Sequence, residues 1–280
     1  MSVFLELLKS LLYGIVEGIT EWLPVSSTGH LILLGELCPL QVSEAFSEMF
    51  DVVIQLGAIL AVIVLFFRKL NPFAPSKSAL EKKNTWGLWF RVCVAVIPSA
   101  VIGILLDDWL DTHLYNYVTV AVALVVYGIL FIILEKCKPA ASASVTDVGD
   151  IGYKLAFLIG LFQVLSLIPG TSRSGSTILG AMLLGCSRGA AAEFSFFMAI
   201  PTMLGASLLK AVKLVAEGVT LTTLEWGILA VGCTTAFLVS LAAIRFLTDF
   251  VKKHSFASFG WYRIALGVLV VGYFFLFGRA

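Results

Sequence analysis

Acidic, hydroxyl and imidazole side chains crowd into one short stretch near the amino terminus, from Glu17 to His30. It reads Glu-Gly-Ile-Thr-Glu-Trp-Leu-Pro-Val-Ser-Ser-Thr-Gly-His and lies inside a strongly apolar region. Polar groups are costly to bury in such surroundings, and ionisable residues within a membrane segment mark functional sites by default. We therefore expect the chemistry of the protein to be organised around this stretch.

Glu17 and Glu21 are four residues apart, so a helix would carry both carboxylates on one face. Like charges at that spacing repel, and burying them without partners is strongly unfavourable. A bound divalent cation would relieve both problems, because hard cations bind carboxylate oxygens. The alternative is that one glutamate is protonated or hydrogen-bonded in a helix interface. The nearby Gly14 and Gly18 predict close packing of the same helix against a neighbour.

Pro24 should end this first helix, and the hydroxyls of Ser26, Ser27 and Thr28 would then stand at the start of a second one. Helix N-termini present free N–H groups and a positive dipole, which together bind anions. Ser27 and His30 are three residues apart on one face, and a histidine beside a serine can act as its general base. One alternative is that a hydroxyl only caps the helix, which would explain one of the three hydroxyls. The alternative for His30 is a purely structural role.

A second polar break, from Pro169 to Thr177, repeats this device and adds Arg173. A guanidinium inside a membrane needs an anionic partner, and its fork suits phosphate oxygens. The alternative partner is Glu17 or Glu21, which would not exclude a role in substrate binding. Together the two breaks suit a phosphate or pyrophosphate with a bridging cation. Neither a P-loop motif nor a Gly-x-Ser-x-Gly elbow occurs at these breaks.

Composition indicates an integral, polytopic membrane protein, because 59% of the 280 residues are hydrophobic and only 13% are charged. A soluble domain usually carries about 25% charge. The net charge of +1 gives no field for nucleic acid. The five cysteines have no metal-binding spacing, and we expect them to be small buried hydrophobes. The N-terminal segment lacks the basic start of a signal peptide, so we expect it to be retained.

The apolar segments predict an all-α polytopic membrane protein built from two inverted repeats, each with a re-entrant helix hairpin and three transmembrane spans. The stretches between the breaks and the next loops are too short for the roughly twenty residues that a span needs. Each half therefore begins with a hairpin that enters the membrane and turns back. The predicted first repeat, 1–140, has a hairpin at about 10–38 and spans at about 45–67, 86–106 and 115–134. The predicted second repeat, 141–280, has a hairpin at about 151–186 and spans at about 190–209, 225–248 and 258–277. We expect the two repeats to form a single integrated membrane domain.

The repeat hypothesis rests on matched motifs. An offset of 145 aligns Leu23-Pro24-Val25-Ser26-Ser27-Thr28 with Ile168-Pro169-Gly170-Thr171-Ser172-Arg173, and a nearly equal offset aligns the segments after Phe50 and Phe194. Broken helices at a repeat interface are typical binding sites in membrane proteins. Chance similarity between apolar segments is the alternative.

Basic loops predict the orientation. Lys and Arg gather in 68–85, 135–154 and 249–257, which should therefore be cytoplasmic. The 107–114 segment has three aspartates and no Lys or Arg, and 210–224 has only two lysines. The first hairpin would then enter from outside and the second from inside, and the site would open outward.

Other polar residues in apolar segments carry weaker signals. We expect structural roles for Asp51, Gln55, Glu193, Arg91 and Arg245, with Asp51 the least settled. Gln163 occupies roughly the position in the second half that Glu17 has in the first, which would make it a relic of the repeat.

At these motifs the whole chain resembles the bacterial undecaprenyl-diphosphatase family of the bacitracin-resistance type. The resemblance is carried by Glu17-x-x-x-Glu21, Pro24-Val25-Ser26-Ser27-Thr28-Gly29-His30, Phe50-Asp51-Val52-Val53-Ile54-Gln55-Leu56-Gly57 and Pro169-Gly170-Thr171-Ser172-Arg173-Ser174-Gly175-Ser176-Thr177. It implies hydrolysis of undecaprenyl diphosphate to the monophosphate, which recycles the lipid carrier for peptidoglycan synthesis in the bacterial plasma membrane. It also implies a divalent metal, an outward-facing site and re-entrant inverted repeats.

Mapped onto this sequence, the resemblance implies that Glu17 and Glu21 hold Mg²⁺ or Ca²⁺ and that Arg173 clamps the phosphate. The implied substrate-binding residues are Ser26, Thr28, Gly29, Thr171, Ser172, Ser174 and Thr177. For the attack we favour Ser27 with His30 as its base; a His30 nucleophile and a metal-activated water are the rivals.

The main competing function is a transporter or flippase of a polyprenyl phosphate or another anion, because broken helices in inverted repeats are typical of transporters. Such a protein would have less use for Ser27 beside His30. A lipid-binding scaffold would leave the polar cluster unexplained. The expected partners are a polyprenyl diphosphate and membrane lipids, and the sequence leaves a homo-oligomer open.

Overall fold

The computed structural model describes residues 3–137 and 143–277, and within them the protein is helical apart from one isolated bridge between Val145 and Cys186. Six of its helical segments are long and apolar enough to cross a membrane. They are Ala45–Leu65, Ala79–Leu106, Tyr117–Cys137, Arg188–Ala216, Thr223–Lys253 and Ala257–Phe277. The predicted all-α polytopic fold and the number of its full spans are confirmed. Residues 138–142, within the basic segment 135–154 that was predicted to be a loop, lie outside the described residues.

The first half runs through seven helices. They are α1 (Val3–Thr20), α2 (Ser27–Leu37), α3 (Glu44–Val53), α4 (Gln55–Leu65), α5 (Phe67–Leu70), α6 (Ala79–Leu114) and α7 (Tyr117–Cys137). The first helix ends at Thr20, earlier than the proline that was expected to stop it. The segment 107–114, expected to be a loop, continues α6, because it contains neither Gly nor Pro to end the helix.

The second half has five α-helices and two short 3₁₀ turns. They are η2 (Val148–Asp150), α8 (Tyr153–Val164), η3 (Leu165–Leu167), α9 (Arg173–Leu183), α10 (Arg188–Ala216), α11 (Thr223–Lys253) and α12 (Ala257–Phe277). Ser187 caps α10, and a capping box of Thr222 and Glu225 begins α11.

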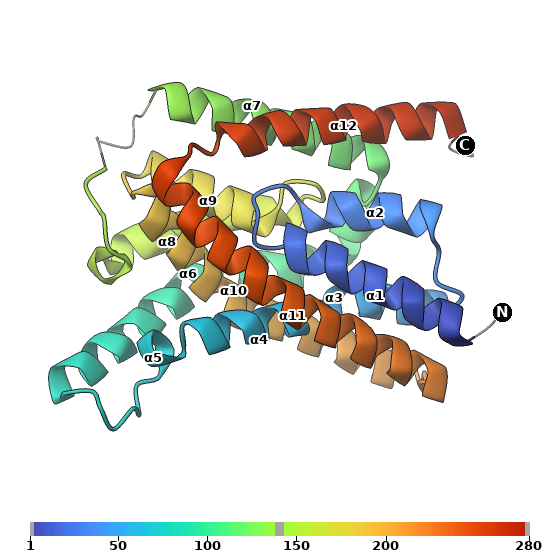
Figure 1. The fold of residues 1–280 in the computed structure, drawn as a ribbon, viewed down its shortest axis with the longest axis horizontal. Helices are drawn as coiled ribbons and strands as arrows, with labels where there is room; N and C mark the ends of the chain where they lie inside the picture. The colour runs from blue at the N-terminus through green and yellow to red at the C-terminus, as the bar shows by residue number, and fades with distance from the viewer. Residues whose placement is uncertain (1–2, 138–142, 278–280) are drawn as a thin grey trace.

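Two short helices, α2 and α9, begin in the interior of the molecule. Each has 11 residues and so is only about 16 Å long, roughly half the hydrocarbon thickness of a bilayer. Figure 1 shows them on opposite sides of the centre, with the loops that precede them between them. The two helix N-termini are therefore held inside the helical assembly.

Glycines let the helices that carry these loops pack closely. A Cβ at Gly14 would lie 2.6 Å from the Gly232 carbonyl oxygen, and α1 packs mainly on α11. A Cβ at Gly160 would lie 2.1 Å from the Ala95 carbonyl oxygen, and α8 packs mainly on α6. The predicted close packing of the Gly14–Gly18 face is confirmed. The first helix of each half thus packs against the second long span of the other half.

The loops rich in Lys and Arg gather at one end of the assembly. Figure 1 shows the segment between α5 and α6, the end of α7 and the junction of α11 with α12 toward the same side. The α2–α3 and α10–α11 connections lie toward the opposite side, near the two termini. The helices therefore run broadly along one common direction, with the basic loops at one end.

Candidate functional site

Two serines with left-handed backbone begin the short helices. Ser26 has φ 73° and Ser172 has φ 72°, and they are the two non-glycine residues with positive φ in the described parts of the chain. Their Oγ atoms accept hydrogen bonds from the backbone N–H groups of Gly29, at 3.3 Å, and Gly175, at 3.1 Å. A left-handed conformation costs energy for a residue with a Cβ and persists where the surroundings enforce it, typically at functional sites.

These caps correct the alignment of the two halves by one residue. They pair Ser26 with Ser172, an offset of 146 rather than 145, because Ser26 and not Ser27 is the residue that precedes its helix. Ser27 then corresponds to Arg173, each being the first residue of its helix. The same offset pairs Glu17 with Gln163, as expected, and Glu21 with Leu167.

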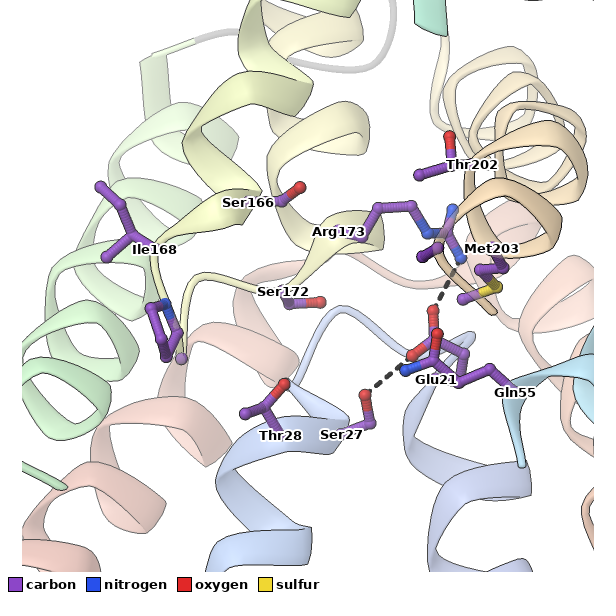
Figure 2. A pocket seen from close by; sticks show the side chains of 13 residues that line it. Glu21, Ser27, Thr28, Gln55, Ser166, Ile168, Ser172, Arg173, Thr202 and Met203 are labelled. Carbon is purple, nitrogen blue, oxygen red and sulfur yellow. Dashed lines mark hydrogen bonds and ion pairs between the residues drawn. The ribbon is translucent and has the colours of Figure 1, made fainter. Parts of the chain in front are cut away.

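Glu21 joins the two helix starts. The Ser27 hydroxyl donates to Glu21 Oε2 at 2.7 Å, and Arg173 Nη2 donates to Glu21 Oε1 at 2.9 Å (Figure 2). All three side chains are largely buried. The ion pair considered for Arg173 is therefore present, and its carboxylate is also the acceptor for Ser27.

Arg173 is oriented by further contacts. Its Nη1 donates to the Ser195 carbonyl oxygen at 2.7 Å and lies 3.2 Å from the Ser195 Oγ, which is in turn 2.6 Å from the Thr177 hydroxyl. The guanidinium also lies over the Trp22 ring, 5.7 Å from its centroid. These contacts hold the Arg173 guanidinium in one orientation, and the same side chain also lines a cavity.

A cavity of about 170 Å³ lies beside this triad. Its wall contains Glu21, Ser27, Thr28, Ser172 and Arg173, all predicted from sequence, and Figure 2 shows their side chains around the same space. It also contains residues to which the sequence analysis gave no role in the site, namely Gln55, Ser166, Ile168, Pro169, Gly170, Thr202, Met203 and Ala206. Isolated polar residues in apolar segments, such as Ser166 and Thr202, were the available signal.

His30 lies outside this wall. Its Nδ1 is 2.7 Å from the Ser26 carbonyl oxygen and its Nε2 is 2.7 Å from the Tyr262 hydroxyl. The ring also stacks on Tyr262. Both ring nitrogens thus have partners other than Ser27, so the expected hydrogen bond between Ser27 and His30 is not formed.

The remaining predicted binding residues support the breaks from within. The Ser174 hydroxyl lies 3.0 Å from the Glu21 carbonyl oxygen and 3.3 Å from that of Leu23, so it ties the second break to the first. Thr171 is buried, and Gly29 packs near Leu124. Like Ser26 and Thr177, these residues do not line the cavity.

Glu17 is fully buried, and neither of its carboxylate oxygens has a hydrogen-bond partner among the described residues. Its charged neighbours are Glu21, Asp51 and Arg173. No group of three His, Cys, Asp or Glu side chains in the described chain could hold a metal by itself. The donor set instead fits a hard cation that takes one or two carboxylates and completes its shell with water and phosphate oxygens, as Mg²⁺ does.

Comparisons with known proteins agree along nearly the whole chain. Residues 10–269 match the family described as "Bacitracin resistance protein BacA". A protein of Lactiplantibacillus plantarum named "Undecaprenyl-diphosphatase" is 56% identical over 272 residues, covering 97% of this chain and 99% of its own. Proteins of the same name from Limosilactobacillus fermentum and Streptococcus thermophilus are 57% and 58% identical, over 97% and 96% of this chain and 99% and 93% of their own.

Proposed function

Because this chain belongs to the bacitracin resistance protein BacA family, we propose that it is a multi-pass membrane phosphatase that hydrolyses undecaprenyl diphosphate to undecaprenyl phosphate and inorganic phosphate. The observation that carries the proposal is the contact of Glu21 with both Ser27 and Arg173 beside a cavity. A nucleophile, a base and a phosphate-binding cation in one buried site suit phosphoryl transfer. The product would return the lipid carrier to cell-wall synthesis and account for bacitracin resistance.

In the proposed reaction, the Ser27 oxygen attacks the terminal phosphorus while its proton passes to Glu21 Oε2. The bond between that phosphorus and the bridging oxygen breaks, and undecaprenyl phosphate leaves. Water then attacks the phosphoserine, the bond between phosphorus and the Ser27 oxygen breaks, and that oxygen takes back the proton held on Glu21 Oε2. Inorganic phosphate leaves with the elements of water, and the Ser27 hydroxyl and the Glu21 carboxylate are restored. Arg173 and the N–H groups at the starts of α2 and α9 stabilise the negative charge on the transferred group.

Glu21 replaces His30 as the proposed base, because Glu21 accepts the Ser27 hydrogen bond and His30 does not. His30 as the base, a His30 nucleophile and a metal-activated water are the rival routes. Phosphoenzyme trapping followed by mass spectrometry separates them. Phosphate on Ser27 supports this route, and phosphate on His30 would overturn it.

A bound divalent cation, Mg²⁺ or Ca²⁺, would neutralise negative charge on the diphosphate. Glu21 would hold it from the cavity wall. Glu17 remains the proposed second carboxylate, supported by its two unpartnered buried oxygens.

We also propose that the two halves, 1–140 and 141–280, are inverted repeats with re-entrant hairpins and that the site opens to the outside. Three observations support this: the matched left-handed caps, the reciprocal packing of α1 on α11 and α8 on α6, and the basic loops gathered at one end. Basic loops favour the cytoplasmic side. The repeats together would form one membrane domain.

The test is phosphate release by the purified protein from a long-chain prenyl diphosphate, with and without a chelator. We expect metal-dependent release that Glu21→Gln and Arg173→Ala both abolish. The control is a cooperative thermal unfolding transition, which shows that the purified protein is folded. If folded protein releases no phosphate with any divalent metal, the phosphatase proposal is wrong and a transporter is favoured. Flux assays in vesicles would then test transport.

A further inference from the structure

Arg263, on α12, is a fully buried arginine that the proposed chemistry does not use. Sequence reasoning missed it because it lies in an apolar span with no polar motif around it. Burying a guanidinium is costly unless its N–H groups find partners. Its hydrogen-bond acceptors in the described chain are backbone carbonyl oxygens rather than a carboxylate.

Those carbonyls belong to both breaks. Arg263 Nη1 donates to the Pro24 oxygen at 3.1 Å, and Nη2 donates to the Gly170 oxygen at 2.8 Å. The offset of 146 set by the two caps makes Pro24 and Gly170 equivalent positions. Nη2 also reaches the Thr171 oxygen at 3.0 Å. One guanidinium therefore binds the same backbone group on the two chain segments that precede Ser27 and Arg173.

Glycines and an aromatic ring surround the Arg263 side chain and the segments that it contacts. A Cβ on Gly175 would lie 3.1 Å from Arg263 Nη1, and a Cβ on Gly170 would lie 2.5 Å from the Val120 carbonyl oxygen. The Tyr127 ring lies beneath the guanidinium, 5.4 Å from its carbon. Gly128 and Gly260 let α7 and α12 approach closely enough to present Tyr127 and Arg263 together.

We propose that Arg263 is a positioning residue: by clamping the Pro24 and Gly170 carbonyls, it fixes the distance between the two breaks and so the placement of Ser27 relative to Arg173. The expected effect on the catalytic rate rests on the proposed function. The effect on the separation of the two breaks does not, because it depends on the fold alone. A group that only filled space would not need contacts to both breaks. A shift of about 1 Å in reacting groups can cost about 10²-fold in rate.

The first test compares Arg263→Lys with the matched control Arg91→Lys. Arg91 also donates to loop carbonyls, those of Gly149 and Ile151, but does not line the cavity. Lysine keeps the charge but lacks the planar fork that reaches several acceptors. We expect Arg263→Lys to lower kcat about 10²-fold while KM stays within threefold, and Arg91→Lys to change neither by more than threefold.

The second test measures the clamp without activity. Spin labels at Leu37 and Leu183, the exposed last residues of α2 and α9, would report the separation of the two short helices in a chain whose five cysteines are replaced. We expect one narrow distance distribution that broadens in Arg263→Lys and in Arg263→Met, but not in Arg91→Lys.

The outcomes separate the two proposals. No phosphate release from the unsubstituted protein would defeat the proposed function, while the label distances would still test the clamp. An active protein in which Arg263→Lys keeps full kcat and an unchanged distance distribution would overturn the clamp. If Arg263→Met does not fold, Arg263→Lys carries the test alone.

Discussion

In the break before α2, the left-handed serine Ser26 is followed by Ser27, whereas in the break before α9 the left-handed serine Ser172 is followed by Arg173. Both serines cap their helices through a glycine three residues later. The backbone is thus shared, and the first helical residue differs: a serine hydroxyl in one half and an arginine guanidinium in the other.

The two halves also differ at the residue five positions before the cap. The first half has Glu21, and the second has Leu167 at the equivalent position. The Glu21 carboxylate therefore serves both breaks, accepting a hydrogen bond from the Ser27 hydroxyl of its own half and from the Arg173 guanidinium of the other. Under the proposed mechanism, the same capped break therefore carries the nucleophile and its base in one half and the charge-stabilising cation in the other.

The largest expected effect comes from removing the shared group. Glu21→Gln should lower kcat at least about 10³-fold, since a positioned base contributes about 10²–10⁴-fold. The matched control is Glu6→Gln, which alters another buried glutamate of the same N-terminal region, paired with Lys9. Steady-state phosphate release measures both, and equal losses in the two variants would contradict a special role for Glu21.

Arg173→Lys should cost about 10²-fold in kcat/KM, the scale of losing one preorganised donor in a charge-stabilising site. Lysine keeps the charge, but it cannot contact Glu21, Ser195 and a phosphate with one planar fork. Arg188→Lys is the control, because Arg188 forms a bidentate pair with Glu135 away from the cavity. A loss of equal size in Arg188→Lys would mean that general destabilisation, and not the second break, explains the effect.

The caps should give smaller and equal effects in the two halves. Ser26→Ala and Ser172→Ala each lose one helix cap, worth about 1 kcal/mol, and keep a Cβ in the left-handed region. Both should therefore lower the thermal unfolding midpoint in detergent, and the corresponding Gly variants should lower it less, because glycine adopts positive φ freely. If the two Ala variants shift the thermal unfolding midpoint by clearly different amounts, the two caps are not equivalent.

Much of this arrangement was predictable from sequence, because membrane burial makes polar residues conspicuous. The six spans and the two breaks followed from apolar lengths and prolines. The cost of a buried charge also predicted an anionic partner for Arg173, but the sequence left phosphate, Glu17 and Glu21 as candidates, and the structure shows Glu21. The one-residue register between the halves did not follow from the sequence, because it depends on which serine adopts positive φ. Arg263 escaped notice because its partners are carbonyls, which every residue carries and no motif reveals.

The partners of His30 also could not be predicted from the sequence, and substituting His30 should give the smallest change in kcat. Spacing placed it on the face of Ser27, but Tyr262, distant in sequence, engages its Nε2, and the Ser26 carbonyl engages its Nδ1. His30→Gln and Tyr262→Phe should each lower kcat only about fivefold, since each removes one ordinary hydrogen bond worth about 1 kcal/mol. Because the two groups act through one contact, the double variant should lose little more than either single variant. Phosphate release by all three, beside Ser27→Ala, measures the difference. If His30→Gln alone matches the loss in Ser27→Ala, His30 is the base after all, and the first break holds its complete catalytic pair without Glu21.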